Sequence, residues 1–127
     1  MKLHTLIAGT ALAASLLSSP ARAHGDDHEH TALHGGVVTE VRDMDYELVA
    51  RPTVIQLYLR DHGKPADVSK ASARLTLLSG TEKQEVELKP AGDRLEAAGS
   101  FKVGTGTKAV AVVTVGGKAS TARFSLK

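Results

Sequence analysis

Residues 53–60, TVIQLYLR, alternate apolar and polar side chains over the length of a typical strand. The apolar members, Ile55, Leu57 and Leu59, share one face of such a strand, and the intervening polar side chains share the other. Period-two alternation indicates a β-strand that is buried on one side, because successive strand side chains point to opposite faces. The stretch therefore predicts a sheet that rests one face on an apolar core.

Similar runs follow one another from residue 36 to residue 126. We expect strands at about 36–42, 45–50, 53–60, 73–79, 83–89, 94–98 or 101–103, 107–115 and 118–126. Gly116 and Gly117 can adopt the positive φ angles of a tight hairpin between the last two runs. No segment after residue 23 has a convincing 3.6-residue apolar period. The pattern predicts an all-β fold, an antiparallel immunoglobulin-like β-sandwich of about seven strands, with a small closed barrel as the alternative.

The first 23 residues have the three parts of a secretory signal peptide. Lys2 supplies the positive charge, residues 6–17 are an apolar run, and Ala21-Arg22-Ala23 is a small-x-small cleavage site. A membrane anchor is the alternative, but a span needs about 20 apolar residues and this run ends at Ser18. We therefore expect a signal peptide over 1–23, a flexible tail rich in histidine and acidic residues over 24–35, and a β-sandwich domain over 36–127. The predicted location of the mature chain is the periplasm.

Charge and composition argue against several classes of function. The chain has 16 Lys and Arg against 14 Asp and Glu, but removal of residues 1–23 takes away Lys2 and Arg22 and balances the charge. A balanced chain with two Tyr, two Phe and no Trp lacks the basic surface and the stacking platform that nucleic-acid binding requires. No nucleophile elbow or phosphate-binding loop is present, so we expect no enzyme and no organic cofactor. No segment after residue 23 is long and apolar enough to span a bilayer, so we expect no membrane insertion of the mature chain.

Four of the five histidines that remain after cleavage fall in the short stretch 24–34, with acidic residues between them. The candidate metal ligands are His24, His28, His30, His34, Asp26, Asp27 and Glu29. Neutral imidazole binds late first-row transition metals, and carboxylates add oxygen donors that offset the charge of the cation. The chain has no cysteine, and Met44 is its one methionine after the signal peptide. It therefore offers few of the soft sulfur ligands that Cu(I) prefers. The donor set favours Cu(II) or Zn(II), with Ni(II) as a further option.

The spacing of these histidines matches neither a zinc finger nor an H-E-x-x-H helix, so a rigid structural zinc site is not expected. Two roles are open for His34, which either completes the ligand set of the tail or fixes the tail to the domain through a hydrogen bond. In an up-and-down arrangement, the turns at Met44 and His62 lie at one end of the first three strands, about 23 Å from His34 at the other. His62 is therefore predicted to be a turn residue rather than a ligand of the same ion.

Three pieces of the sequence carry a family resemblance. They are His34-Gly35-Gly36, the run Tyr46-Glu47-Leu48-Val49 and the turn Asp61-His62-Gly63-Lys64-Pro65. With them, residues 34–127 resemble small periplasmic β-sandwich domains associated with heavy-metal efflux systems of the RND type, which occur alone or within adaptor subunits. The resemblance implies periplasmic metal handling, without fixing the ion, and a periplasmic efflux component as a partner.

These observations give three hypotheses for function. The first is a non-enzymatic periplasmic protein that binds Cu(II) or Zn(II) through its N-terminal tail, in metal buffering, delivery or efflux-linked resistance. The second is a non-catalytic interaction domain that docks on an efflux or export component, with the tail only accessory. The third, a copper oxidase or oxygenase built on an amino-terminal His24 chelate, lacks a clearly placed second imidazole ligand and ranks last.

The cleavage site decides the copper chemistry at the new N-terminus. Cleavage after Ala23 makes His24 the first residue, whose α-amine and imidazole chelate one ion. Cleavage after Ala21 would instead put His24 in third place, where a square-planar site for Cu(II) or Ni(II) can form. We expect the intact mass of the exported protein to correspond to residues 24–127. A mass higher by one arginine and one alanine would contradict this.

Overall fold

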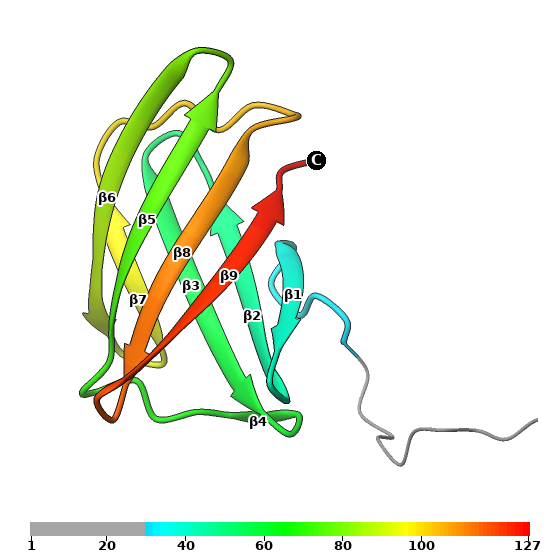
Figure 1. The fold of residues 1–127 in the computed structure, drawn as a ribbon, viewed down its shortest axis with the longest axis vertical. Helices are drawn as coiled ribbons and strands as arrows, with labels where there is room; N and C mark the ends of the chain where they lie inside the picture. The colour runs from blue at the N-terminus through cyan, green and yellow to red at the C-terminus, as the bar shows by residue number, and fades with distance from the viewer. Residues whose placement is uncertain (1–29) are drawn as a thin grey trace, which may run out of the picture.

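The computed structural model describes residues 30–127, and every regular element among them is a β-strand (Figure 1). The strands are β1 (Val37–Val41), β2 (Met44–Ala50), β3 (Val54–Asp61), β4 (Lys64–Pro65), β5 (Ser72–Ser79), β6 (Glu82–Ala91), β7 (Arg94–Ala98), β8 (Lys108–Val115) and β9 (Lys118–Ser125). Neighbouring strands pair antiparallel throughout. The predicted all-β antiparallel architecture is confirmed.

The strands form two layers that face each other across the core (Figure 1). One layer has the order β1-β2-β3-β7, and the other has the order β6-β5-β8-β9. Strand β6 joins them, because its residues 82–88 pair with β5 and its residues 89–91 pair with β7. On the opposite side the edges of β1 and β9 approach, and Thr39 Oγ1 donates a hydrogen bond to the Arg123 carbonyl oxygen at 2.7 Å. The sandwich is therefore nearly closed into a barrel.

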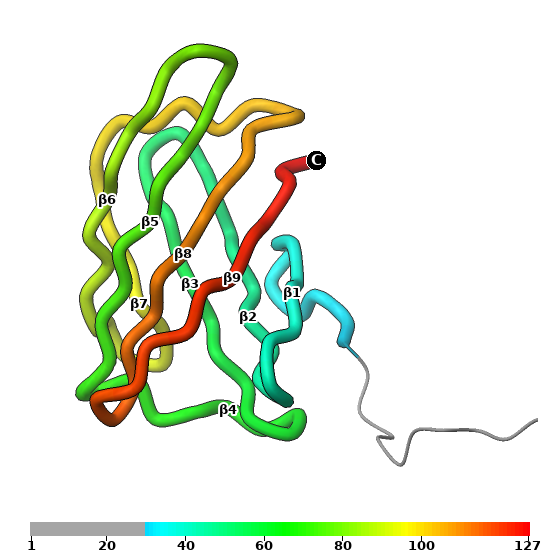
Figure 2. The backbone as a smooth tube through the Cα atoms, viewed as in Figure 1, coloured from blue at the N-terminus to red at the C-terminus, as the bar shows by residue number. Residues whose placement is uncertain are grey.

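The connections between the layers follow a Greek-key path. Strands β5, β6 and β7 are consecutive neighbours, and β8 returns beside β5 after the long connection 99–107 (Figure 2). This order, β7-β6-β5-β8, is the one that defines a Greek key and is common in antiparallel sandwiches. The path therefore agrees with the sandwich prediction.

The core consists of the side chains that alternation directs inward from both layers. Ile55, Leu57 and Leu59 of β3 are all at most 2% exposed, as the opening sequence stretch predicts. Opposite them lie inward-facing side chains of the other layer, which are Leu75, Leu77, Val86, Leu88, Ala122, Phe124 and Leu126. Buried apolar area of this kind stabilises a fold by about 25 cal/mol per Å², and no disulfide contributes because the chain has no cysteine.

The predicted strands match the observed ones closely, with one ambiguity resolved and one addition. Of the two alternatives near residue 100, residues 94–98 form β7, whereas residues 101–103 belong to the connection. The two-residue strand β4 was not predicted, because two residues are too few to show a period. The hairpin prediction at Gly116 and Gly117 is confirmed, since their φ angles are 58° and 80°.

The turn between β1 and β2 holds two non-glycine residues at positive φ, Arg42 at 51° and Asp43 at 66°. Left-handed backbone costs a non-glycine residue about 1 kcal/mol, and two-residue turns of this kind favour Asn-Gly. The double substitution Arg42→Asn/Asp43→Gly should therefore raise the free energy of unfolding by about 1 kcal/mol. Urea denaturation measures it, with Gly117→Ala as the opposite control, which should destabilise. An unchanged or lower stability of the double variant would contradict the turn geometry.

Candidate functional site

Strand β2 carries two carboxylates on the face that points away from the core. Tyr46 and Leu48 point inward, so Asp45 and Glu47 occupy the outer face. Outer faces of antiparallel sheets are usually solvated. Here, however, Asp45 is 2% exposed and Glu47 is 1% exposed. Something must therefore cover this face of β2.

The cover is the segment 30–36, which we call the N-terminal strap. It precedes β1, reverses at Gly35 and Gly36, and lies across the outer face of β2. Gly35 has a φ of 77°, which favours glycine. A Cβ atom on Gly36 would lie 2.4 Å from the Leu48 carbonyl oxygen, so only glycine fits this close approach. The predicted flexible tail over 24–35 thus includes residues 30–35 that pack on the domain.

Glu47 holds the centre of the strap. Its carboxylate accepts backbone N–H bonds from Leu33 at 2.9 Å, His34 at 2.7 Å and Gly36 at 3.0 Å, and His34 Nδ1 lies 3.0 Å from it. Burial alone raises the pKa of Glu47, but the hydrogen bonds from Leu33, Gly36 and His34 outweigh it and hold that pKa below its usual value. The ionised carboxylate is thus the form that binds the strap.

His34 belongs to this anchor. Its ring stacks on Tyr58 of β3, with ring centroids 3.6 Å apart and an interplanar angle of 5°. Tyr58 is the cross-strand partner of Glu47, so ring and carboxylate meet His34 from adjacent strands. Of the two roles that the sequence left open for His34, the structure shows the hydrogen bond that fixes the strap to the domain.

Arg60 of β3 lies between the two buried carboxylates and is itself only 5% exposed. Its Nη2 donates to the Thr31 carbonyl oxygen at 2.8 Å and lies 3.9 Å from Asp45 Oδ2. Its Nη1 lies 3.6 Å from Glu47 Oε1 but has no hydrogen-bond partner among residues 30–127. Arg60 therefore balances both negative charges and also holds the strap.

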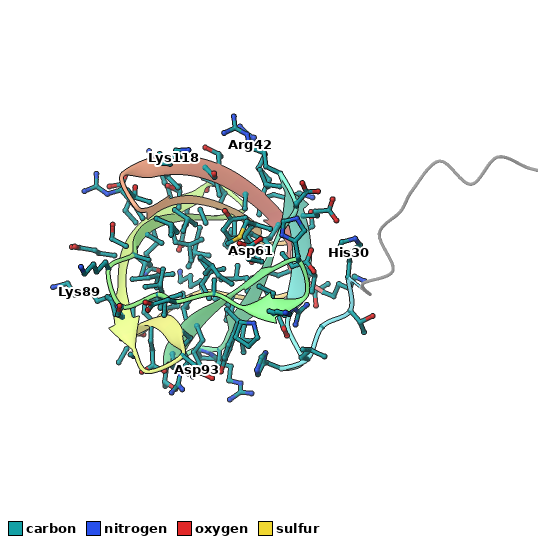
Figure 3. All side chains as sticks on the ribbon, turned by 90° about the horizontal axis from the view of Figure 1, so that it is seen from below. His30, Arg42, Asp61, Lys89, Asp93 and Lys118 are labelled. Carbon is teal, nitrogen blue, oxygen red and sulfur yellow. The ribbon has the colours of Figure 1, made fainter. Side chains whose placement is uncertain are left out.

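The start of the strap brings an imidazole against two carboxylates. His30 Nδ1 lies 2.7 Å from Asp45 Oδ1, and His30 Nε2 lies 2.6 Å from Glu40 Oε2 of β1. One ligand atom from each of the three residues falls within 4.8 Å of the others. Asp45 Oδ2 is buried and has no hydrogen-bond partner in the described part of the chain. Figure 3 shows His30 on the outside of the molecule, on the side opposite Lys89.

The predicted ligands divide into three groups. His24, Asp26, Asp27, His28 and Glu29 lie outside the described residues. His30 joins the cluster with Glu40 and Asp45, and His34 joins the Glu47 anchor. Sequence reasoning missed Glu40, Asp45, Glu47 and Arg60. The signal for three of them was present, because the alternation in DYEL and in QLYLR puts Asp45, Glu47 and Arg60 on one face.

The turns at Met44 and His62 do lie at one end of the first three strands, since Met44 pairs with Asp61 and His62 N–H donates to the Asp43 carbonyl. His62 occupies a turn, with a φ of 51°, as predicted. The predicted separation concerned His34 and did not place His30. Because the strap folds back along β2, His30 contacts Asp45, which is the strand neighbour of Met44.

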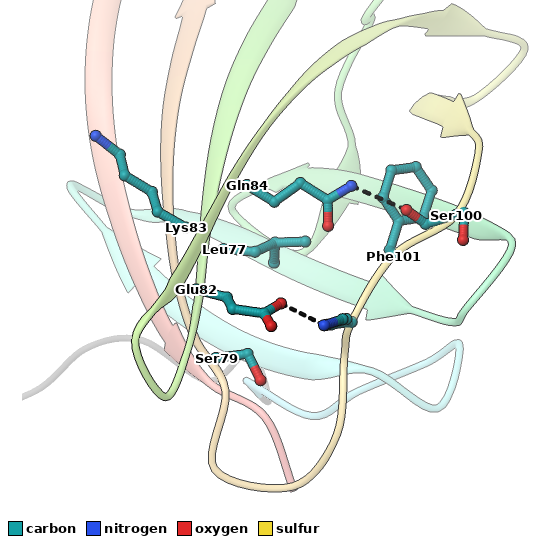
Figure 4. Close-up of a pocket in the computed structure, with 8 residues that line it drawn as sticks. Leu77, Ser79, Glu82, Lys83, Gln84, Ser100 and Phe101 are labelled. Atoms are coloured by element: carbon teal, nitrogen blue, oxygen red, sulfur yellow. Dashed lines mark hydrogen bonds and ion pairs between the residues drawn. The ribbon is translucent and has the colours of Figure 1, made fainter.

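A second concave region lies away from the strap. It is a cleft of about 320 Å³ between the β5–β6 hairpin and residues 100–102 (Figure 4). Its main polar groups already serve internal contacts, because Gln84 donates to the Ser100 carbonyl and Lys102 pairs with Glu82. The cleft therefore offers a ligand little unsatisfied chemistry, and the His30 cluster is the stronger candidate.

No family model, curated protein or solved structure matches the chain. The resemblance to efflux-associated domains therefore stays a prediction. Within residues 30–127, no helix is long and apolar enough to cross a membrane.

The Glu47 anchor predicts a pH-dependent stability. The substitution Glu47→Gln should lower the free energy of unfolding at pH 7 by about 3 kcal/mol, the scale for losing one partner of a buried ion pair. Because the pKa of Glu47 is lowered by folding, its contribution is present above the unfolded value of about 4.3 and is lost as the pH falls through the folded value. The difference between wild type and variant should therefore shrink between pH 5 and pH 3, as urea denaturation would measure.

Glu85→Gln is a matched control for this experiment. Glu85 is also a strand glutamate with a basic neighbour, but its side chain is 60% exposed and its ion pair with Lys83 is at the surface. Its substitution should change stability by at most about 0.5 kcal/mol at any pH. Equal effects of the two substitutions would mean that Glu47 does not anchor the strap.

Proposed function

We propose that this protein is a periplasmic, non-enzymatic transition-metal-binding protein that takes up Cu(II) or Zn(II) at its N-terminal side. The observation that supports this most is the juxtaposition of His30, Glu40 and Asp45, whose ligand atoms lie within 4.8 Å of one another. Imidazole and carboxylate are suitable donors for both ions. The proposed role is metal buffering, delivery or efflux-linked resistance.

The two ring nitrogens of His30 have different roles in this proposal. They point in different directions, so one ion binds through only one of them. An ionised carboxylate can only accept a hydrogen bond, so each of these contacts calls for a hydrogen on its ring nitrogen. In this proposal the ion replaces the hydrogen on Nε2, which is released as a proton, while Asp45 keeps the hydrogen on Nδ1. The ion then binds Nε2 and Glu40, in the arrangement in which a carboxylate orients a metal-binding histidine through its other nitrogen.

The surroundings of the two carboxylates support this division. Asp45 is buried beside the Arg60 guanidinium, which repels a cation. The Glu40 side chain is 40% exposed and contacts His30 Nε2 from the solvent side, so it has room to move. Binding of one ion at about 2.0–2.2 Å from both ligand atoms requires His30 Nε2 and Glu40 Oε2 to separate to about 3 Å. Glu40 can supply that movement.

Two protein ligands do not complete the coordination of either ion. Further ligands come, in this proposal, from His24, His28 and the acidic residues that immediately precede His30 in the sequence. A site assembled from a strand residue and a chain end differs from the closed four-ligand sites that hold structural zinc. Its ion is more easily exchanged, which suits a carrier better than a structural centre.

The proposal predicts that metal affinity depends on His30. Zn(II) or Cu(II) titration of residues 24–127 by competition with a chromophoric chelator should show binding, and His30→Ala should weaken it at least about tenfold. His62→Ala is the matched control, because His62 also contacts a carboxylate, Asp61, but in an exposed turn outside the cluster. It should leave the affinity within about twofold.

Equal losses in the two variants would contradict the assignment of the site. The isolated peptide 24–34 provides a further comparison. Binding by the whole chain that is no tighter than binding by this peptide would favour the alternative, in which the domain docks on an efflux or export component and the tail is accessory.

A further inference from the structure

We propose that Glu47 is a positioning residue that couples metal binding at His30 to docking of the N-terminal strap. This inference rests on the proposed function, since it concerns the control of that same metal site. Under this proposal, the protein has a far higher affinity for the ion when the strap is docked on β2 than when the strap is released. The metal-loaded and metal-free proteins then differ in what covers the outer face of β2.

His30 lies outside the strands of the described residues. It lies seven residues before β1, so it reaches Glu40 and Asp45 only when the intervening chain folds back. That reversal is held mainly by Glu47, through the N–H groups of Leu33, His34 and Gly36. Loss of these bonds would release His30 from the two carboxylates.

Glu47 acts through the strap, since its hydrogen bonds go to Leu33, His34 and Gly36. Its carboxylate also lies 3.6 Å from Arg60, whose other side approaches Asp45 at 3.9 Å and binds the Thr31 carbonyl. Arg60 thus links the anchor at Glu47 to the orienting residue Asp45. The strap and the metal site share one buried set of charges.

Metal binding and strap docking are linked thermodynamically. If the ion prefers the docked strap by some factor, the ion must raise the docking equilibrium by the same factor, because coupling between two binding events is reciprocal. Docking protects the Leu33, His34 and Gly36 amides, because Glu47 accepts their hydrogen bonds. Their hydrogen exchange therefore reports docking at the anchor, away from the ligand atoms.

The test is amide hydrogen exchange of residues 24–127, with and without saturating Zn(II). We expect Zn(II) to slow exchange at Leu33, His34 and Gly36 at least about tenfold and to leave the amides of β8 and β9 unchanged. Zn(II) binding with unchanged exchange at the strap would overturn the coupling while leaving the proposed function standing. Absence of Zn(II) binding by the wild type would overturn both.

Two variants test the same inference from the other direction. Glu47→Gln removes the charge of the anchor, and Gly36→Ala leaves every charge in place but puts a Cβ atom 2.4 Å from the Leu48 carbonyl oxygen. Both should weaken Zn(II) binding at least about tenfold while protection in β8 and β9 shows that the sandwich is folded. Glu85→Gln and Gly117→Ala are the matched controls and should bind as the wild type does. Wild-type affinity in Gly36→Ala with an undocked strap would refute the positioning role.

Discussion

The Glu47 carboxylate accepts three backbone N–H bonds from the strap while it is 1% exposed to solvent. A buried carboxylate is costly unless it is paired and hydrogen-bonded. Here the strap supplies the hydrogen bonds and Arg60 supplies the opposite charge. The buried carboxylate needs the hydrogen bonds of the strap, and the strap needs the carboxylate as their acceptor. The position of residues 30–36 therefore follows from the charge that β2 places under them. The cluster of His30, Glu40 and Asp45 depends on that position, because His30 is the first described residue of the strap.

The Glu47 carboxylate lies on the outer face of the sheet because successive side chains of a pleated strand point to opposite faces. Strand β2 uses one set of alternate side chains for the core and leaves the other set on the outer face. Cross-strand pairing then places Arg60 beside Asp45, Tyr58 beside Glu47 and Glu40 beside Asp45. An outer face made in this way is rigid, because its residues belong to strands with a packed core beneath them. It therefore offers the strap a fixed surface, on which His30 and His34 are held.

Sequence reasoning recovers the strands because burial on one face leaves a period of two, as in Ile55, Leu57 and Leu59. It could not choose between residues 94–98 and 101–103, since Leu95 and Phe101 each stand in a short alternating run. It also identified His30 and His34 as functional candidates from composition alone. It missed Glu40, Asp45, Glu47 and Arg60, because alternation assigns them to a face that is normally in water.

What the sequence could not supply is the path of the strap. The reversal at Gly35 and Gly36 is held by hydrogen bonds of backbone N–H groups. A pattern of side chains does not show which backbone groups form such bonds. The glycine at 36 marks the close approach to Leu48, but a glycine pair fits many turns equally well. Long-range contacts between a chain end and a strand have to be seen in three dimensions. For this reason the return of His30 to Asp45, the strand neighbour of Met44, was not predicted.

In the proposed metal site, the docked strap and the metal ion share His30. A crystal structure of residues 24–127 loaded with Zn(II), with the ion located by anomalous scattering, tests this most directly. The account predicts the ion on His30 Nε2 and Glu40, with Nδ1 of the same ring on Asp45 and the Leu33, His34 and Gly36 amides on Glu47. An ion bound elsewhere, or bound to His30 with the strap lifted from Glu47, would contradict it.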